Sequence, residues 1–435
     1  MSLNNRHVIV LSVDAMVYED IETLSRLSTF QEVWHRVARV NKVKSIYPSI
    51  TYPCHVTMET GMYPDKHGII NNEQPIIGQR NSPWQHERSL VKTKTIFDYA
   101  KEAGLTTASV FWPVTGNDPA IDYLINEYWP QTPEETAVEC FRNSGSSEEV
   151  IEKVVKPNLP ILDNHHRKHP YCDIFIMRCA CEMVRNFKPN LLLIHPANVD
   201  AYRHQTGLFT EKVTQGLYET GTWFFELMKA CEDAGILDDT DFFVVSDHGQ
   251  MNISRCVAPN VKLKEAGLID VDEAGEVKDW RAFCKAAGLS AHVYLKNPDN
   301  KKDWEATKKV LDDLCAEGVY GISRVYTAQE AQKEEHLAGD FSFVLETDDF
   351  TSFANDWNRP LTRRLDNQNY RFGRATHGHL PHKGPQPTLF AFGPHIKEGV
   401  VMENAHLVDE APTFAGALGI EMPGTDGRCL KEILK

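Results

Sequence analysis

The sequence predicts an α/β fold in which helices cover both faces of a mostly parallel central sheet, with a small α+β insertion. Three observations predict it. Short apolar runs, typical of strands buried on both faces, alternate with amphipathic helical segments through the first quarter of the chain. The alternation of strands and helices resumes later in the chain. A stretch without this alternation then separates it from a final strand and helix. Polar residues follow several apolar runs, as expected where the strands of such a sheet end.

The first half of the chain supplies four strands and four helices. Apolar runs predict strands over Val8–Val13, Val43–Tyr47, Thr106–Trp112 and Pro189–Pro196. Apolar positions at helical spacing predict helices over Ile21–Val40, Pro53–Thr60, Lys94–Gly104 and Cys172–Phe187. Residues 114–163 contain several prolines and an acidic bias, which indicates an elaborated connection and not a separate domain.

The second half begins with a long amphipathic helix over Leu208–Ala234 and a strand that ends in a turn over Asp241–Gly249. The pattern then changes to strand, helix, strand and strand over Ala291–Leu295, Trp304–Leu314, Ile322–Val325 and Phe341–Leu345. A strand over Pro387–Gly393 and a helix over Ala411–Leu418 return to the first pattern. Because 435 residues exceed one small domain, we expect a core of residues 1–255 and 374–435 with a cap insertion of residues 256–373.

The composition argues against two kinds of partner. A formal net charge of −15 at pH 7 disfavours a nucleic-acid polymer, because such binding uses clustered basic residues. The chain has neither a run of eighteen apolar residues nor a signal-peptide pattern at its start, so we expect no membrane span.

The ten cysteines lack Cys-x-x-Cys spacing, which predicts buried free thiols and a cytoplasmic location. The oligomeric state has no signal in the sequence.

Seven residues with nucleophilic or metal-binding side chains follow apolar runs or mark turns. They are Asp14, Thr51, Asp200, His204, Asp247, His248 and His377. Three carboxylates and three imidazoles suit two sites for Zn²⁺ or a similar first-row metal. Taken singly, each has a plain structural reading: Thr51 could cap a helix, and Asp200 and His204 could lie on a surface helix by chance. Their combination favours a two-metal centre with a hydroxyl beside it.

Several motifs resemble the nucleotide pyrophosphatase/phosphodiesterase family of the alkaline phosphatase superfamily. They are Thr51, Asn72, Asp200-x-x-x-His204, Ser246-Asp247-His248-Gly249 and Thr376-His377-Gly378. The resemblance reaches from about residue 7 to 430, although the stretches 114–168 and 256–373 carry no matching motif. It implies that residues 1–255 and 374–435 form an alkaline-phosphatase-like, three-layer catalytic core.

The resemblance also implies roles for the eight residues. One metal would be held by Asp200, His204 and His377, and a second by Asp14, Asp247, His248 and the Thr51 oxygen. Asn72 stands where the family places an amide that holds a phosphoryl oxygen together with the Thr51 backbone N–H. The implied reaction is hydrolysis of a phosphodiester or pyrophosphate bond in a small phosphoester, with two divalent metal ions, expected to be zinc, and a phosphothreonine intermediate.

Two other functions fit the same residues. A hydrolase that cleaves carbon–phosphorus bonds, resembling phosphonoacetate hydrolase, shares the threonine and both metal sets, and a non-catalytic phosphoester-binding protein could keep the same scaffold. We expect the leaving group to contact the 256–373 insertion and the loop Gln74–Trp84. Trp84, Tyr63 and Phe111 are candidates for stacking on a base or lining an apolar pocket. No arginine stands beside Thr51 in the sequence to bind a doubly charged phosphoryl group, although Arg80 and Lys44 keep that question open.

Overall fold

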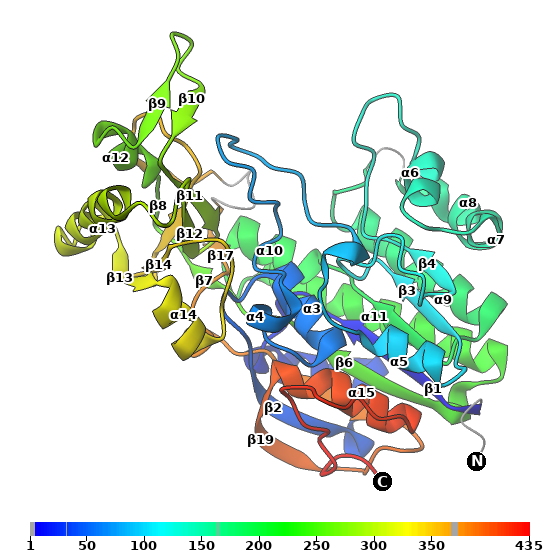
Figure 1. Ribbon diagram of the computed structural model, residues 1–435. Coiled ribbons are helices and arrows are strands. Elements are labelled where there is room, and N and C mark those ends of the chain that lie inside the picture. Colours follow the sequence, from blue (N-terminus) through cyan, green and yellow to red (C-terminus); the bar gives the residue numbers. More distant parts are fainter. Residues whose placement is uncertain (1–4, 32, 163–164, 367–372) are drawn as a thin grey trace.

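An eight-stranded sheet lies at the centre of the computed structural model, which describes residues 5–31, 33–162, 165–366 and 373–435 (Figure 1). The strand order is β19-β2-β18-β6-β1-β5-β3-β4. The strands are β1 (His7–Ser12), β2 (Ala38–Lys44), β3 (Thr107–Val110), β4 (Tyr123–Ile125), β5 (Leu191–Ile194), β6 (Thr240–Val245), β18 (Leu389–Phe392) and β19 (Val401–His406). Among the described strands of this sheet, β18 alone runs opposite to the others. The predicted mostly parallel α/β fold is confirmed.

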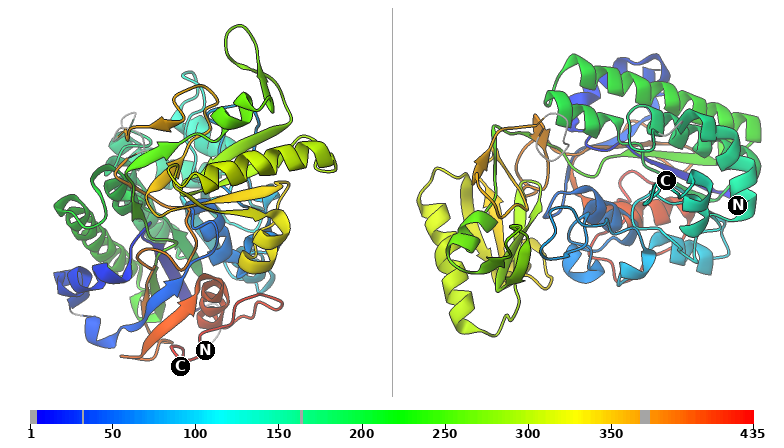
Figure 2. Two further views of the ribbon diagram at one scale, coloured as in Figure 1. Left: turned by 90° about the vertical axis from the view of Figure 1, so that its left-hand side faces the viewer. Right: turned by 90° about the horizontal axis from the view of Figure 1, so that it is seen from above.

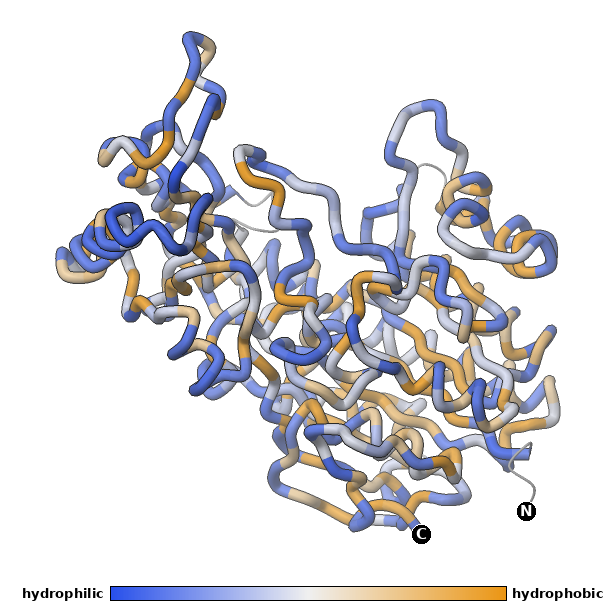
Figure 3. Tube along the Cα trace, in the orientation of Figure 1, coloured by the Kyte–Doolittle hydropathy of each residue, from blue (hydrophilic) through white to orange (hydrophobic). Residues whose placement is uncertain are grey.

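Side chains of successive strand residues point to opposite faces of the sheet, and this alternation builds two cores. In β1, Ile9 and Leu11 join one hydrophobic cluster, while Val8 and Val10 join the other. The first cluster is covered by α9 (Tyr171–Phe187) and α11 (Glu211–Ala234), and the second by α3 (Thr51–Thr60), α5 (Ile96–Glu102) and α15 (Glu410–Leu418). The view from above in Figure 2 shows the resulting three layers, and Figure 3 shows apolar residues concentrated along them.

The prediction of one helix over Ile21–Val40 is wrong. The segment contains α1 (Ile21–Arg26), α2 (Ser28–Gln31) and a 3₁₀ turn (Trp34–Arg36), and then enters β2. The backbone turns extended at Leu27 and again at Val37, which ends the helical hydrogen bonding. The predicted strand over Val43–Tyr47 is likewise displaced, since β2 ends at Lys44. Pairing with β18 and β19 fixes the earlier position, because Val40 lies opposite Leu389 and Met402.

The segment predicted as the insertion contains a separate antiparallel sheet with its own hydrophobic cluster (Figure 1). Its four strands are β11 (Ala282–Ala287), β12 (Ser290–Leu295), β13 (Ile322–Thr327) and β14 (Phe343–Thr347), and its helices are α12 (Asn260–Glu265), α13 (Lys301–Ala316) and α14 (Ala328–Glu335). Shorter strands are β9 (Ile269–Val271), β10 (Val277–Trp280), β8 (Arg255–Val257), β15 (Thr351–Phe353) and β16 (Thr362–Arg363). The exact limits of the insertion, residues 256 and 373, stay a prediction. Strand β8 runs across the first limit, and residues 367–372, next to the second limit, lie outside the described residues.

The connection predicted over residues 114–163 is mainly helical after β4. It contains α6 (Ala137–Asn143), α7 (Glu148–Val150), a π-helical turn (Ile151–Val155) and α8 (Lys156–Leu162). Val150, Val154 and Leu162 are buried in the same cluster as α9, so this segment extends the layer on one face of the sheet. The remaining elements are α4 (Pro64–His67), α10 (Asn198–Thr206), β7 (Met251–Asn252) and β17 (Ala375–Thr376).

The ten cysteines are free, and eight of them are buried, as the sequence predicts. Burial raises the pKa of thiols such as Cys54, Cys179 and Cys284, which keeps them protonated and unreactive. Within the described part of the chain, every helix is too short or too polar to cross a membrane. The location of the protein stays a prediction.

His67 is a neutral core residue whose hydrogen bonds determine which ring nitrogen carries the proton. The backbone N–H of Ile69 donates to Nδ1 at 3.2 Å, so Nε2 carries the proton and donates to Thr57 Oγ1 at 3.0 Å. The ring is fully buried, and burial lowers the pKa of His67 to about 3. In the unfolded chain the same ring titrates at about 6.5. The unfolded state therefore takes up a proton as the pH falls below about 6.5, and the folded state does not.

We expect a measurable contribution of His67 to the acid sensitivity of folding. The stabilisation from the neutral ring is lost as the pH falls from about 6.5 towards 3, so wild type should lose about 2 kcal/mol more stability between pH 6.5 and 5 than His67→Gln. Chemical denaturation at several pH values measures this difference. His35→Gln, at an exposed position, is the matched control. Equal slopes for wild type and His67→Gln would contradict the assignment.

Candidate active site

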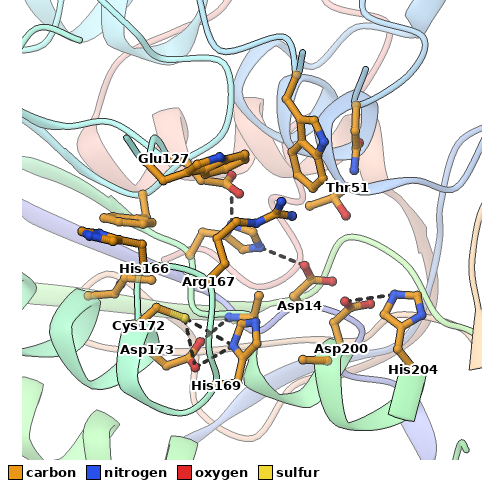
Figure 4. A pocket seen from close by; sticks show the side chains of 18 of the residues that line it. Asp14, Thr51, Glu127, His166, Arg167, His169, Cys172, Asp173, Asp200 and His204 are labelled. Atoms are coloured by element: carbon orange, nitrogen blue, oxygen red, sulfur yellow. Dashed lines mark hydrogen bonds and ion pairs between the residues drawn. The ribbon is translucent and has the colours of Figure 1, made fainter. Parts of the chain in front are cut away.

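The seven predicted residues meet at the edge of the central sheet where most of its strands end, and Figure 4 shows four of them, Asp14, Thr51, Asp200 and His204. Asp14 follows β1, Asp247 and His248 follow β6, and Thr51 is the first residue of α3. Asp200 and His204 lie one turn apart on α10, which follows β5, and His377 follows β17. The spacing of four between Asp200 and His204 thus places both side chains on one helical face.

One set of three ligand atoms comes from Asp200, His204 and His377, here called the Asp200 group. His204 Nε2 lies 3.2 Å from Asp200 Oδ2, and His377 Nε2 lies 3.8 Å from Asp200 Oδ1. His204 Nδ1 donates to the carbonyl oxygen of Ala375 at 2.7 Å, which turns Nε2 towards the carboxylate. Gln250 Nε2 donates to Asp200 Oδ1 and to the Asp200 backbone oxygen, and so fixes the carboxylate in place.

A second set comes from Asp14, Asp247 and His248, here called the Asp247 group. His248 Nε2 lies 3.1 Å from Asp247 Oδ2 and 3.6 Å from Asp14 Oδ1. His248 Nδ1 donates to the Gly249 carbonyl at 3.2 Å, so its Nε2 keeps a lone pair for a cation. The ring of His248 stacks on that of His377, with centroids 4.0 Å apart. The two groups are therefore direct neighbours.

The carboxylates of the two groups are buried together, and this makes the site fit cations. Burial raises the pKa of Asp14 well above its usual value, and the carboxylates of Asp200 and Asp247 raise it further. Burial also raises the pKa of Asp247 to about 7. Asp14 Oδ1 and Asp247 Oδ2 are buried and accept no hydrogen bond from the described residues. Buried anionic oxygens without donors are suited to metal ligation, and the mixed nitrogen and oxygen donors fit a first-row dication.

Thr51 lies next to the Asp247 group. Its Oγ1 is 3.2 Å from His248 Nε2, and the residue is buried at the N-terminal end of α3, where unpaired N–H groups and the helix dipole favour an anion. His55, one turn along α3, donates from Nδ1 to the Thr51 carbonyl at 2.8 Å and accepts at Nε2 from Ser12 at 2.9 Å. Burial lowers the pKa of His55 well below its usual value, so the ring is a neutral support for the first turn of the helix.

Asn72 reaches the same helix end from the loop that follows α4. Its Oδ1 accepts the backbone N–H of Tyr52 at 2.8 Å. Because only the oxygen of the amide can accept from an N–H, this bond leaves the NH₂ group as the donor on the other side. Asn72 and Thr51 both line the cavity described next. The amide is therefore placed to donate to an oxygen bound near Thr51.

A cavity of about 350 Å³ opens over both groups (Figure 4). Its walls include Trp84 and Phe111, two of the predicted aromatic residues, whereas Tyr63 stacks on His336 with ring centroids 4.4 Å apart. Among the described residues, those that line it lie outside the 256–373 insertion. The predicted contact between the leaving group and the insertion stays a prediction, and the loop Gln74–Trp84 reaches the large cavity through Trp84. Glu127, Trp129 and several residues between 166 and 176 line this cavity as well.

The insertion contributes to a second, smaller pocket of about 40 Å³. Ala286, Gly288 and Phe353 line it from the insertion, and Asn72 and His377 line it from the core. Since Asn72 and His377 also line the large cavity, the two pockets share a wall at the metal-binding groups. The insertion thus touches the site from one side only.

Four further residues belong to the site; His195 lies close to the motifs in the sequence, whereas Gln250, His55 and Arg167 have no signal there. Gln250 orients Asp200, His55 supports Thr51, and His195 Nε2 lies 3.1 Å from Asp14 Oδ2. Arg167 lies in the cavity wall, with its guanidinium 4.8 Å from the ring centroid of Trp84 and 4.3 Å from that of Trp129. The question that Arg80 and Lys44 left open thus gains a further candidate, because Arg167 and Thr51 line one cavity although they are far apart in the sequence.

Comparison with protein families assigns the chain to a family independently of the site geometry. The family model described as type I phosphodiesterase / nucleotide pyrophosphatase matches residues 8–378, which is most of the chain. The chain belongs to this family. The resemblance seen in its motifs is confirmed.

Two relatives in the nucleotide pyrophosphatase/phosphodiesterase family are distant in sequence and longer than this chain. An ectonucleotide pyrophosphatase/phosphodiesterase of Caenorhabditis elegans is 22% identical over 341 residues, covering 73% of this chain and 39% of that protein. Ectonucleotide pyrophosphatase/phosphodiesterase 1 of Saccharomyces cerevisiae is 25% identical over 271 residues, covering 58% of this chain and 33% of that protein. The chain therefore spans roughly a third to two fifths of the length of these relatives.

Solved structures of the family share the fold. Human ectonucleotide pyrophosphatase/phosphodiesterase 5 superposes with a TM-score of 0.67 at 15% identity, covering 99% of this chain and 100% of that one. The murine protein gives a TM-score of 0.66 at 16% identity with the same coverage, in a form described as an inactive threonine-to-alanine variant in complex with AMP. At this level of identity, the likeness establishes the common architecture.

Proposed function

We propose that this family member hydrolyses a phosphodiester or pyrophosphate bond of a small phosphoester, with Thr51 as the nucleophile. The observation that carries the proposal is the position of the Thr51 hydroxyl. Its oxygen lies 3.2 Å from a nitrogen of the Asp247 group, beside the Asp200 group and in the wall of a cavity. A threonine hydroxyl beside two sets of metal-ligand atoms, and in the wall of a cavity, is placed to react with a bound molecule or to bind a cation.

Two divalent metal ions complete this site in the proposal. Asp200, His204 and His377 would hold one ion, and Asp14, Asp247 and His248 would hold the other. The donor set favours zinc, since imidazole and carboxylate together suit it better than magnesium or calcium. Such ions supply positive charge that lowers the pKa of an adjacent hydroxyl and stabilises negative charge on a phosphoryl group.

Thr51 then attacks phosphorus in line with the leaving oxygen. A bond forms between Thr51 Oγ1 and phosphorus, the bond from phosphorus to the leaving oxygen breaks, and the hydroxyl proton passes to water. Hydrolysis of the resulting phosphothreonine restores the hydroxyl. The Asn72 amide and the N-terminal end of α3 donate hydrogen bonds to a nonbridging oxygen as its charge grows. His55 and Gln250 hold Thr51 and Asp200 in the required orientation.

The side of the cavity away from α3 favours an anionic or aromatic leaving group. Arg167 extends over the cavity between Glu127 and Thr51 (Figure 4), and the two tryptophan rings beside it restrict its movement. A second phosphate or a carboxylate would pair with the guanidinium, and a base could stack on Trp84. These contacts support a nucleotide pyrophosphate as substrate over a simple dialkyl ester.

A side-by-side assay tests the proposed function. The zinc-loaded protein should hydrolyse an aryl phosphodiester and a nucleoside triphosphate faster than an aryl phosphomonoester or phosphonoacetate. Arg167→Gln should raise KM for the triphosphate more than for the aryl diester, because only the triphosphate places a further anion near the guanidinium. A strong preference for phosphonoacetate would instead establish the carbon–phosphorus hydrolase. Metal binding without turnover of any of these compounds would favour a non-catalytic binding protein.

A further inference from the structure

A third set of metal-ligand side chains lies at the start of α9, outside the two groups described above. It consists of His169, Cys172 and Asp173, here called the Cys172 cluster. His169 Nδ1 is 2.7 Å from Asp173 Oδ2 and 3.5 Å from Cys172 Sγ, and the sulfur is 3.7 Å from Asp173 Oδ2. The three donor atoms therefore mark the corners of a small triangle.

The Cys172 cluster has the dimensions of the other two groups. The nitrogen-to-oxygen distances in the Asp200 and Asp247 groups lie between 3.1 and 3.8 Å, close to the edges of the triangle at Cys172. Cys172 and Asp173 are buried, and Asp173 Oδ1 accepts the backbone N–H of Ala197 at 2.8 Å, so the carboxylate is fixed from the far side. Its other oxygen remains directed at the imidazole and the thiol (Figure 4).

We propose that the Cys172 cluster binds a third metal ion, with zinc as the fitting element. A thiolate, an imidazole and a carboxylate are all zinc ligands, and sulfur selects zinc over magnesium and calcium. Three protein ligands leave a fourth tetrahedral position vacant, which is the pattern of zinc sites that also bind a small molecule. All three residues line the 350 Å³ cavity that Thr51 also lines, so a small molecule in that cavity could supply the fourth ligand.

The position of this ion gives it a role in the proposed reaction. The cluster shares the cavity with Arg167, on the side assigned above to the leaving group. A zinc ion there would bind an anionic oxygen of that group, such as a terminal phosphate. This role rests on the proposed function, whereas the binding of the ion does not.

The alternative is an ion pair without metal. In that case Asp173 holds a proton on His169: burial lowers the pKa of the imidazole, but the nearby carboxylate outweighs burial and raises it well above its usual value. Such a pair needs neither the sulfur nor its placement beside both other donors. Replacing Cys172 separates the two arrangements.

Cobalt(II) substitution tests the third site with the metal alone as the probe. Thiolate ligation gives cobalt(II) a charge-transfer absorption in the near ultraviolet, and the Asp200 and Asp247 groups contain no sulfur that could produce it. Wild-type protein reconstituted with cobalt should show this band and bind about three ions per chain by elemental analysis. Cys172→Ser should lose the band and bind about two. Cys179→Ser, a buried cysteine on the same helix outside the cluster, should behave as wild type.

A second variant controls for the possibility that Cys172→Ser loses the ion because it misfolds. His169→Gln leaves both buried residues of the cluster unchanged and should also reduce the count to about two, with an unchanged far-ultraviolet circular dichroism spectrum. Two ions per chain and no band in wild type would overturn the third site. If that result came with normal diester turnover, the proposed function would stand. A clear band and three ions in a protein without turnover would instead support the third site and remove the function.

Discussion

Replacing Thr51 with alanine is expected to lower kcat/KM for a phosphodiester by at least about 1,000-fold, or ~4 kcal/mol of transition-state stabilisation. The variant removes the oxygen that lies 3.2 Å from His248 Nε2 and leaves the surrounding ligand atoms in place. Its binding of substrate should change much less, since the Asn72 amide and the helix end remain. Steady-state kinetics with an aryl phosphodiester, together with a metal count of the variant, measures both effects.

Thr51→Ser is the matched control for this loss. Serine keeps the hydroxyl but lacks the methyl group that restricts the side chain, so it should retain a substantial fraction of activity. The serine variant should also accumulate a phosphoserine when the reaction is quenched early, and the alanine variant should show no label on the protein. Turnover by Thr51→Ala within tenfold of wild type would exclude a nucleophilic role for this residue.

Removal of the metal ions is expected to abolish turnover and to lower stability. The carboxylates of Asp14, Asp200 and Asp247 lie in neighbouring groups, and Asp14 and Asp247 are buried with donor-free oxygens. Without dications, burial and the neighbouring carboxylates raise the pKa of Asp14 and Asp247, so removing their protons to form a ligand set costs free energy. Loss of ions bound 100-fold above Kd removes about 3 kcal/mol per site, so the melting temperature should fall by several degrees. Calorimetry before and after chelation measures the shift.

Zinc added back to the stripped protein should restore both activity and melting temperature. Thr51→Ala provides the control, because it should lose stability on chelation as wild type does although it has no activity to lose. Asp247→Asn should bind fewer ions than wild type and should respond less to chelation. Full turnover in the presence of excess chelator, at a metal content near zero, would rule out the proposed mechanism.

The candidate site was readable from the sequence because its residues follow strongly apolar strands. Asp14 and Asp247 stand directly after β1 and β6, whose hydrophobic runs mark their ends clearly, and parallel strands bring such ends to one edge. Three carboxylates and three imidazoles with those placements already suggested two sets of ligands. The structure brings the same residues into the Asp200 and Asp247 groups, and the roles assigned to them await the experiments above.

Features that depend on tertiary contacts could not be read in this way. The segment Ile21–Val40 has apolar residues at helical spacing, but its last part pairs with β18 and β19, which are hundreds of residues away. Arg167 lines the cavity although it lies in the stretch 114–168, which carries no matching motif. The Cys172 cluster lines the same cavity, and its residues look like an ordinary helix start until Asp173 is seen beside Ala197.

The position of β18 between β2 and β6 has a consequence for the order in which the protein matures. During synthesis, the ribosome delivers six of the seven predicted residues before the insertion, and only His377 after it. The two halves of the sheet that flank β18 cannot join until residues 389–392 have left the exit tunnel. The residues of the Asp247 group are therefore all synthesised before His377 of the Asp200 group, so in the proposed two-metal site the set for the second ion would be completed only near the end of translation.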